Sequence, residues 1–302
     1  METKKNKPLL TISLLISNRL DTIPRCLDSL RPIMEQIPSE LILVDTSKNP
    51  EVHELLLSYT DKVYEFEWCK DFAKARNVGM QHATGEWFLF LDDDEWFVEI
   101  KPLVDFFQSG EYKKYGYAHY MVRNFYDPNY SYYSDSWVSR MVRMDKDTHF
   151  KGKIHEHFYP VYGECKYIDA LAYHSGYIFI TEEQKRAHFE RNATLLLDMM
   201  KEEPNNLRWS TQYAQEFRSV KEWKGLYDFC KEQIELTKHI NDEYDNIYIG
   251  TFWGGFAVAS LMLKRYDEAL EMCLNCIKDK RTTELCKAFM YISLAEATSA
   301  RN

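Results

Sequence analysis

The sequence predicts an α/β fold for residues 1–180 and an all-helical region for residues 181–302. In the first part, short apolar segments alternate with helical patterns, which is typical of a parallel sheet with right-handed crossovers. Several of these apolar segments end in polar or acidic residues, and strand signals almost vanish after Thr181. A chain of 302 residues accommodates two such domains.

The composition excludes several classes of protein. The chain has 38 basic and 47 acidic residues, a formal net charge of −9, which argues against non-specific binding of nucleic acid or an anionic membrane surface. We find neither a signal peptide pattern nor a transmembrane segment. Seven scattered cysteines without paired metal spacing suit a reducing compartment. We therefore expect a cytoplasmic protein.

The first part gives a regular succession of elements. In order, we expect a strand at residues 9–16, a helix beginning at Asp21 or Thr22, a strand at 41–44, a helix at 52–59, a strand at 63–66, a helix at 71–80 and a strand at 86–91. Polar residues follow three of the strands, at Ser17-Asn18-Arg19, at Asp45 and at Asp92-Asp93-Asp94. Open α/β sheets bind ligands at this edge, so we expect these residues to meet at one ligand.

The acidic segment Asp92-Asp93-Asp94-Glu95 follows the apolar residues 87–91, which fit a strand buried on both faces. Carboxylates at one strand end repel each other unless a positive group lies between them. A hard divalent cation takes carboxylate and phosphate oxygens together, so one interpretation is a metal site for a phosphorylated ligand. The alternative is a solvated acidic turn, and the segment alone favours neither.

The motifs LILVD, DFAKARN and WFLFLDDDE, in this order after an apolar strand with a polar turn, resemble the nucleotide-sugar half of family 2 glycosyltransferases. The resemblance covers residues 9–180. It implies the GT-A fold, a Rossmann-like mixed sheet with helices on both faces. Residues 121–125 and 137–144 would add mixed or antiparallel strands to this sheet.

The resemblance also implies a role for individual residues. Asp45 would hold the nucleoside, Asp71 and Arg76 would line the base and diphosphate, and Ser17, Asn18 and Arg19 would contact the donor. In the DXD pair, Asp92 would face the ribose or the metal and Asp94 would bind the metal directly. Asp93 would lie in the donor site at the variable, replaceable middle position.

A second group of polar residues lies at His155-Glu156-His157, where we expect a strand with the two histidines on one face and Glu156 opposite. From the residues alone, this is either a polar strand end or a catalytic segment. Related enzymes carry a similar Gly-Lys-Ile-His-Glu segment, so the resemblance implies Glu156 as the catalytic base, with Asp135 in reserve. The imidazole ligand of the metal would be His155 or His174, and the pattern His174-Ser175-Gly176-Tyr177 favours His174.

The sequence pattern of residues 181–302 predicts helices. Thr181 and Gln184 form a capping-box pattern, and residues 204–206 break the first helix. Residues align at a separation of 43 positions, pairing Ala214 with Ala257, Trp223 with Tyr266, and Cys230 with Cys273. This spacing resembles lengthened tetratricopeptide repeats, with a closing helix at 284–295; an ordinary helical bundle is the alternative. Trp209, Phe252 and Trp253 would serve a dimer or peptide groove, or the core.

Together, these motifs are similar to bacterial peptide and protein S- or O-glycosyltransferases. The implied activity is inverting, metal-dependent transfer of a sugar from a nucleoside diphosphate, with UDP favoured, to a hydroxyl or thiol of a peptide, protein or glycan. The implied cofactor is Mn²⁺ or Mg²⁺, and a homodimer through the helical domain is an expectation. Alternatives are a transferase for surface polysaccharide or lipid-linked glycan, a catalytically silent repeat module, and a nucleotidyltransferase, which would need a Gly-rich loop after the first strand.

Overall fold

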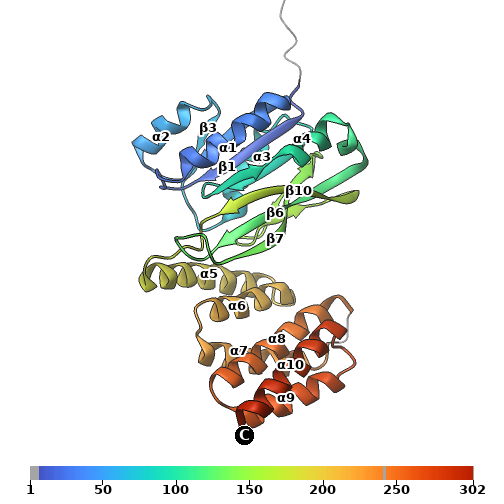
Figure 1. Cartoon of the computed structure of the whole chain (residues 1–302). Helices are drawn as coiled ribbons and strands as arrows, with labels where there is room; N and C mark the ends of the chain where they lie inside the picture. Colours follow the sequence, from blue (N-terminus) through green and yellow to red (C-terminus); the bar gives the residue numbers. More distant parts are fainter. Residues whose placement is uncertain (1–6, 241–242, 302) are drawn as a thin grey trace, which may run out of the picture. The chain divides into compact units, whose positions relative to one another are not determined.

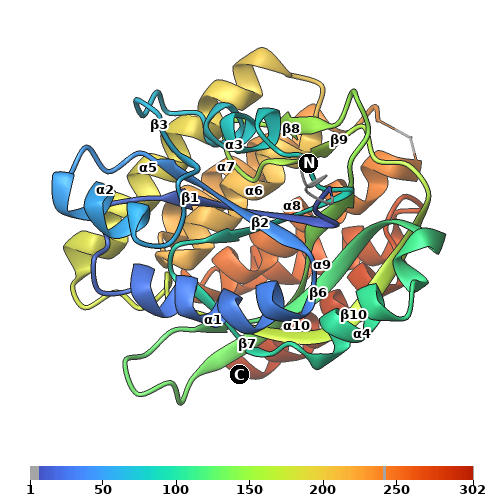
Figure 2. The same ribbon diagram turned by 90° about the horizontal axis from the view of Figure 1, so that it is seen from above.

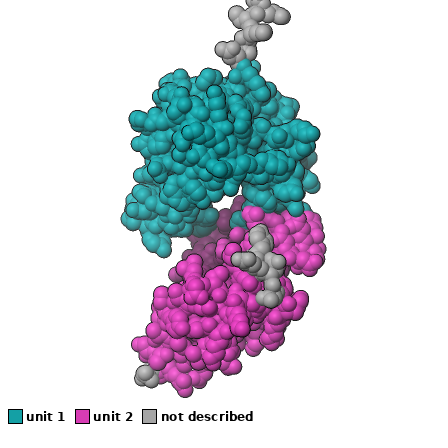
Figure 3. Space-filling view, turned by 90° about the vertical axis from the view of Figure 1, so that its right-hand side faces the viewer, with its two compact units in different colours: residues 1–180 teal, residues 181–302 magenta. Residues whose placement is uncertain are grey.

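The computed structural model describes residues 7–240 and 243–301. The chain divides into two compact units, residues 1–180 and 181–302 (Figure 3). Unit 1 carries a mixed α/β structure, and unit 2 is built from helices (Figure 1). Each unit has a hydrophobic core of its own.

Unit 1 contains a sheet of eight strands and a smaller two-stranded sheet. Its elements, in chain order, are β1 (Leu10–Ile16), α1 (Ile23–Gln36), β2 (Ser39–Asp45), α2 (Pro50–Leu57), β3 (Val63–Glu65), α3 (Phe72–Gln81), β4 (Trp87–Asp92), β5 (Glu95–Glu99), α4 (Lys101–Gln108), a 3₁₀ turn η1 (Glu111–Lys114), β6 (Tyr115–Phe125), β7 (Tyr133–Arg143), β8 (His149–Lys151), β9 (His157–Tyr159) and β10 (Glu164–His174).

The large sheet is mixed, as predicted, with strand order β3-β2-β1-β4-β7-β6-β10-β5. Strands β1, β2, β3 and β4 run parallel, β7 pairs antiparallel with both β4 and β6, and β10 pairs parallel with β6. The register sets Ile16 of β1 beside Asp45, and Leu15 beside Asp92. The polar ends of β1, β2 and β4 therefore meet at one edge of the sheet, as the sequence predicts.

Helices cover both faces of the large sheet. Leu10, Ile12 and Leu14 of β1 are buried in the core that includes α1, α2 and α4. Leu15 of the same strand packs instead with Ala75 of α3. Figure 2 shows α1 and α4 along one face and α3, with β8 and β9, along the other. Because successive side chains point to opposite faces and both faces are covered, these strands read as uninterrupted apolar segments.

Glu40 lies near the start of β2, at the end of the sheet away from the acidic segment, and connects β2 with neighbouring segments through hydrogen bonds and an ion pair. Its Oε1 accepts hydrogen bonds from Thr11 Oγ1 at 2.5 Å and from Thr84 N at 2.5 Å, and Lys62 Nζ lies 2.5 Å from Oε2. Burial opposes ionisation of this carboxyl, but these donors outweigh it and lower its pKa to about 2. Glu40 therefore favours the folded state wherever it is ionised.

We expect Glu40→Gln to lower the free energy of unfolding at pH 7 by about 1–3 kcal/mol, because it removes a charge-assisted network. The folded pKa lies below the ordinary value of 4.5, so the stabilisation is complete above pH 4.5 and is lost as the pH falls toward 2. Urea unfolding at pH 7 and pH 3 measures this difference, with the exposed Glu35→Gln as control. An equal deficit at both pH values would contradict the assignment.

Unit 2 contains six helices in its described residues: α5 (Glu182–Glu202), α6 (Leu207–Ser219), α7 (Trp223–Leu236), α8 (Glu243–Met262), α9 (Tyr266–Lys278) and α10 (Glu284–Arg301). Thr181 and Gln184 form the predicted capping box. Trp223 and Tyr266, which align at 43 residues, are the first residues of α7 and α9. The aligned Cys230 and Cys273 are both fully buried.

From the sequence, three aromatic residues of unit 2 fit either a binding groove or the core. The structure places them in the core. Trp209, Phe252 and Trp253 are 1%, 0% and 8% exposed. A dimer or peptide groove built on these three side chains is therefore excluded. In the part of the chain that the structure describes, no helix has both the length and the apolar character of a membrane span.

Candidate active site

The acidic segment forms a buried turn between two strands. Asp92 ends β4, Glu95 begins β5, and only Asp93 and Asp94 connect them. Asp93, Asp94 and Glu95 are 4%, 5% and 1% exposed. The interpretation as a solvated acidic turn is therefore wrong, and each buried carboxylate must be stabilised by specific partners.

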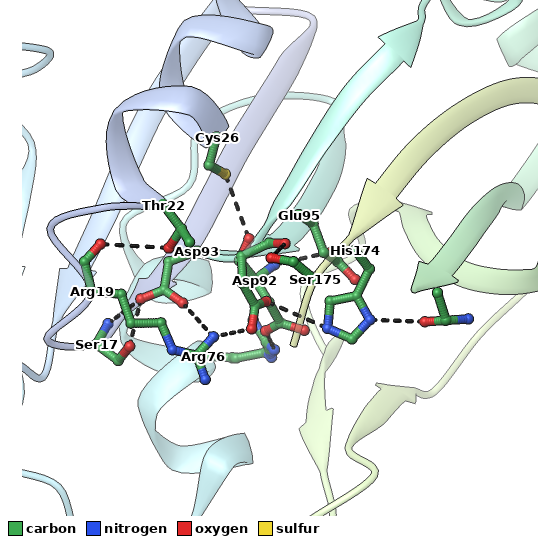
Figure 4. Close-up of polar contacts among 12 residues, drawn as sticks. Ser17, Arg19, Thr22, Cys26, Arg76, Asp92, Asp93, Glu95, His174 and Ser175 are labelled. Atoms are coloured by element: carbon green, nitrogen blue, oxygen red, sulfur yellow. Dashed lines mark hydrogen bonds and ion pairs between the residues drawn. The ribbon is translucent and has the colours of Figure 1, made fainter. Parts of the chain in front are cut away.

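Asp93 joins this turn to the end of β1. Its Oδ2 accepts hydrogen bonds from Ser17 N at 2.6 Å and Ser17 Oγ at 2.7 Å, while Arg19 Nη1 lies 3.4 Å from Oδ1 (Figure 4). Burial raises the pKa of Asp93 even though these donors oppose the rise. The carboxylate of Asp93 thus holds Ser17 and the turn that carries Arg19, while the replaceability of Asp93 remains a prediction.

Arg76 of α3 holds two further carboxylates. Its Nε donates to Glu156 Oε1 at 2.5 Å, and its Nη2 donates to Asp92 Oδ1. The guanidinium is 5% exposed and lies 4.4 Å from the ring centroid of Phe90. Burial opposes ionisation of Asp92, but Arg76 and Arg140 outweigh it and hold the pKa of Asp92 well below its usual range. Asp92 is therefore an ionised, doubly paired carboxylate.

The sequence prediction assigns no role to Arg140 or Glu95, which belong to the same network. Arg140 of β7 donates through Nη2 to Asp92 Oδ2 at 3.0 Å and to Glu95 Oε1 at 2.7 Å. Glu95 is fully buried; burial raises its pKa to about 7, while Arg140 acts in the opposite direction. Met141 pairs with Ala118 and Ser139 pairs with His119, so Arg140 is the extra residue of a β-bulge. Such a bulge redirects a side chain, and here the residue reaches the acidic turn.

A signal for Arg140 exists in the sequence. It is a charged residue in a strand pattern, with Val138 and Val142 two positions away on either side. In a regular strand, these three side chains share one face. A charge between two valines needs a partner, but the bulge sets Val138 and Val142 on opposite faces of the sheet, so this signal marks Arg140 as unusual without placing its side chain.

Asp94 faces His174 at the end of β10. His174 Nε2 lies 3.5 Å from Asp94 Oδ1, and His174 Nδ1 lies 2.8 Å from Asn124 Oδ1. Since the Asn124 oxygen accepts, the proton is on Nδ1 and the lone pair of Nε2 is directed away from Asn124. Burial lowers the pKa of His174 to about 4, so the ring is neutral at neutral pH.

The arrangement fits a divalent cation. Asp94 Oδ1 is buried without a hydrogen-bond donor, and the neutral Nε2 beside it is also an acceptor. A Cβ added to Gly176 would lie 2.4 Å from His174 Nε2 and 2.5 Å from Asp94 Oδ2, so only glycine leaves this space open. Asn124 holds the other ring nitrogen, as partners of metal-bound histidines do.

Asp94 and His174 would supply two ligands to such an ion. Among the described residues, no three His, Cys, Asp or Glu side chains gather as a ready ligand set. Mg²⁺ commonly takes one or two carboxylates and completes its shell with water and substrate phosphates. Acidic side chains also outnumber basic ones in the site, where five carboxyl groups lie beside three guanidinium groups; they are Asp92, Asp93, Asp94, Glu95 and Glu156 beside Arg19, Arg76 and Arg140.

The end of β2 borders a cavity of about 530 Å³, lined by Asp45, Lys48, Asn49, Pro50, His53, Glu54, Glu65, Phe66 and Glu67. Asp45 Oδ1 accepts hydrogen bonds from Ser47 N at 2.9 Å and Ser47 Oγ at 2.6 Å, and Oδ2 lies 3.0 Å from His53 Nδ1. Asn18 Oδ1 accepts a hydrogen bond from Asn49 Nδ2 at 2.8 Å. The predicted residues Asn18 and Asp45 therefore belong to one end of the sheet.

Other predicted residues have structural partners. Asp71 is the N-cap of α3, and its Oδ1 accepts a hydrogen bond from Lys74 N at 2.9 Å. Asp135 receives two hydrogen bonds from Arg123, both at 2.8 Å. This pairing lowers the pKa of Asp135, which makes it a weak base.

The segment around Glu156 differs from its prediction. Residues 152–156 form a bend between β8 and β9, so the expected strand through His155 and Glu156 is wrong. His155 has φ +51°, and Gly152 has φ +101°. This turn, rather than strand alternation, carries Glu156 to Arg76. No rule of alternate faces applies to His155 and Glu156.

Known proteins resemble this chain over both units. The family model for "Glycosyl transferase family 2" matches residues 12–166. The SPbeta prophage-derived glycosyltransferase SunS of Bacillus subtilis is 24% identical over 252 residues, which are 80% of this chain and 56% of SunS. This chain therefore spans little more than half the length of that relative.

Two further matches extend the comparison. A TPR repeat-containing protein of Synechococcus elongatus is 31% identical over 85 residues, which are 28% of this chain and 20% of that protein. Among solved structures, S. aureus TarS 1–349 in complex with UDP-GlcNAc has a TM-score of 0.42 and 14% identity, with coverage of 97% of this chain and 91% of TarS 1–349.

Proposed function

Because the chain belongs to glycosyl transferase family 2, whose model covers residues 12–166, we propose that it transfers a sugar from a UDP-sugar to another molecule. The acceptor group is a hydroxyl or thiol of a peptide, protein or glycan, and the reaction inverts the anomeric centre. Mn²⁺ or Mg²⁺ is the cofactor. These details go beyond family membership and are the proposal.

One observation carries the metal dependence. Asp94 Oδ1 is buried without a donor and faces the neutral Nε2 of His174 at 3.5 Å. Two acceptors in contact in a buried space favour a cation between them over an empty site. When bound, a divalent ion neutralises charge on the diphosphate leaving group. Asp94 and His174 would hold that ion, and Asn124 would fix the His174 ring.

The cavity beside Asp45 supports a nucleoside donor. It lies at the carboxyl end of β2, and Asp45 is 5% exposed with Ser47 and His53 fixing its oxygens. A fixed carboxylate accepts a hydrogen bond from a base N–H group, which uracil offers at N3. We therefore place the uracil ring beside Asp45 and the diphosphate toward the end of β4.

Glu156 is the base in this proposal. Its side chain is 10% exposed, and the hydrogen bond from Arg76 Nε to Oε1 orients the carboxylate. The acceptor oxygen or sulfur attacks the anomeric carbon while Glu156 takes its proton, and the bond to the diphosphate oxygen breaks with both electrons leaving on UDP. Asp135 is less suitable, since Arg123 binds both of its oxygens.

A nucleotide panel tests the proposed donor. With Mn²⁺ present, we expect saturating UDP to raise the unfolding temperature by about 5 °C, because a ligand that binds only the folded state stabilises it. ADP, GDP and CDP should have smaller effects, and EDTA should abolish the effect of UDP. When the protein is incubated with the sugar derivatives of these nucleotides, we expect release of UDP from a UDP-sugar. If no nucleoside diphosphate stabilises the protein and none is released, the proposal fails.

A further inference from the structure

Arg19 is placed unusually for a residue that contacts the buried carboxylates. Its Nη1 donates to Asp94 Oδ2 and lies 3.4 Å from Asp93 Oδ1. The Arg19 side chain is 42% exposed, whereas those of Asp93 and Asp94 are 6% and 7% exposed. The partly exposed Arg19 guanidinium therefore lies between solvent and the buried carboxyl groups of Asp93 and Asp94. Arg76 and Arg140, by contrast, are themselves buried or nearly so, with side chains 5% and 16% exposed.

Arg19 satisfies only one oxygen of Asp94. The other oxygen, Oδ1, is buried and has no hydrogen-bond donor, although His174 Nε2 is 3.5 Å away. The Asn124 contact places the imidazole proton on Nδ1, so Nε2 faces Asp94 with a lone pair. Arg19 therefore reduces the charge of Asp94 without filling the space between Asp94 and His174.

We infer that Arg19 is an exchangeable counter-ion: it occupies Asp94 in the metal-free protein and binds the diphosphate of the donor once a divalent cation has taken Asp94. This inference rests on the proposed function. A guanidinium and a divalent cation on one carboxylate repel each other, so the strength of one contact comes at the expense of the other.

The surroundings of Arg19 allow the exchange. Its long side chain is partly solvent-exposed, so reorientation needs a change of rotamer and no opening of the core. Asp93 holds the backbone of the same turn through Ser17 N, so the base of Arg19 stays in place while the guanidinium moves. A guanidinium also pairs well with phosphate oxygens, which it binds through parallel N–H groups. The freed cation thus has a partner in the donor itself.

The inference predicts effects of opposite sign on two affinities. In Arg19→Met, titration calorimetry should show Mn²⁺ binding in the absence of nucleotide tightened about tenfold, since the competing cation is gone. UDP binding at saturating Mn²⁺ should weaken about tenfold, since a diphosphate ligand is gone. Arg25→Met is the matched control: Arg25 is exposed, lies 3.7 Å above the Trp96 ring, and should leave both affinities unchanged.

Other outcomes separate this inference from the proposed function. If Arg19→Met weakens Mn²⁺ and UDP binding together, or changes only one of them, the exchange is wrong even though wild-type UDP binding stands. If the wild-type protein with Mn²⁺ binds no nucleoside diphosphate, the proposed function itself fails. Arg19→Lys keeps one positive charge and should keep Mn²⁺ affinity within about twofold of wild type. Tightening in Arg19→Lys equal to that in Arg19→Met would also overturn the exchange.

Discussion

Arg140→Met should lower the free energy of unfolding of unit 1 by about 3–5 kcal/mol, the cost of removing one partner from a buried ion pair. Glu95 is 1% exposed and depends on Arg140 Nη2 at 2.7 Å, and Asp92 loses a second contact at 3.0 Å. Chemical denaturation followed by tryptophan fluorescence measures the loss. The deficit should be larger at pH 8 than at pH 5, because the pKa of Glu95 is already raised to about 7 and protonation removes its unpaired charge.

Two variants make this expectation specific. Arg123→Met removes an arginine that pairs with Asp135 on the exposed part of the sheet, and should cost less than about 1 kcal/mol. The double variant Arg140→Met with Glu95→Gln should recover part of the lost stability, because no unpaired carboxylate remains at that position. If Arg140→Met lowered the free energy of unfolding as little as Arg123→Met, the buried ion pairs of Arg140 would not stabilise unit 1 as expected.

Asp94→Asn should reduce the rate of sugar transfer by about 10³-fold, a loss typical of removing a group that stabilises transition-state charge. The same change should leave stability unchanged or raise it. Asp94 Oδ1 is buried without a donor, and an amide at this position can donate to His174 Nε2 at little cost in shape. UDP release at saturating Mn²⁺ measures the first effect, and thermal unfolding without metal measures the second.

The control for Asp94 is Asp169→Asn, an exposed aspartate on β10, the strand that also carries His174. It should leave both rate and stability unchanged. Metal-dependent turnover that survives in Asp94→Asn would show that this carboxylate has no part in holding the cation. A large loss of stability instead would show that Asp94 is a structural residue.

Much of unit 1 was predictable because its core strands have a strong pattern. The segments at β1, β2 and β4 are short, apolar and followed by polar residues, and a parallel sheet brings those ends together. The register confirms this expectation by setting Asp45 beside Ile16 and Asp92 beside Leu15. The roles of Asp45, Asp92 and Asp94 in binding remain predictions.

The remaining parts of the site depend on geometry that spacing does not encode. Arg140 reaches the acidic turn through a bulge, where the two-residue alternation of a strand breaks. Glu156 reaches Arg76 from a bend, where the sequence suggested a strand. The contact of Asp93 with Ser17 is not encoded either, because a DXD pattern says nothing of its middle residue. Each of these contacts joins segments that are distant in the sequence, so local sequence patterns do not predict it.

Anomalous diffraction from a crystal of the wild-type protein grown with UDP and Mn²⁺ would locate the bound cation, the nucleotide and Arg19 together. We expect one manganese peak at roughly 2.0–2.4 Å from both Asp94 Oδ1 and His174 Nε2. We also expect the uracil ring beside Asp45 and the Arg19 guanidinium turned from Asp94 to the diphosphate. UDP bound with no manganese at Asp94 and His174, while Arg19 still pairs with Asp94, would contradict this expectation.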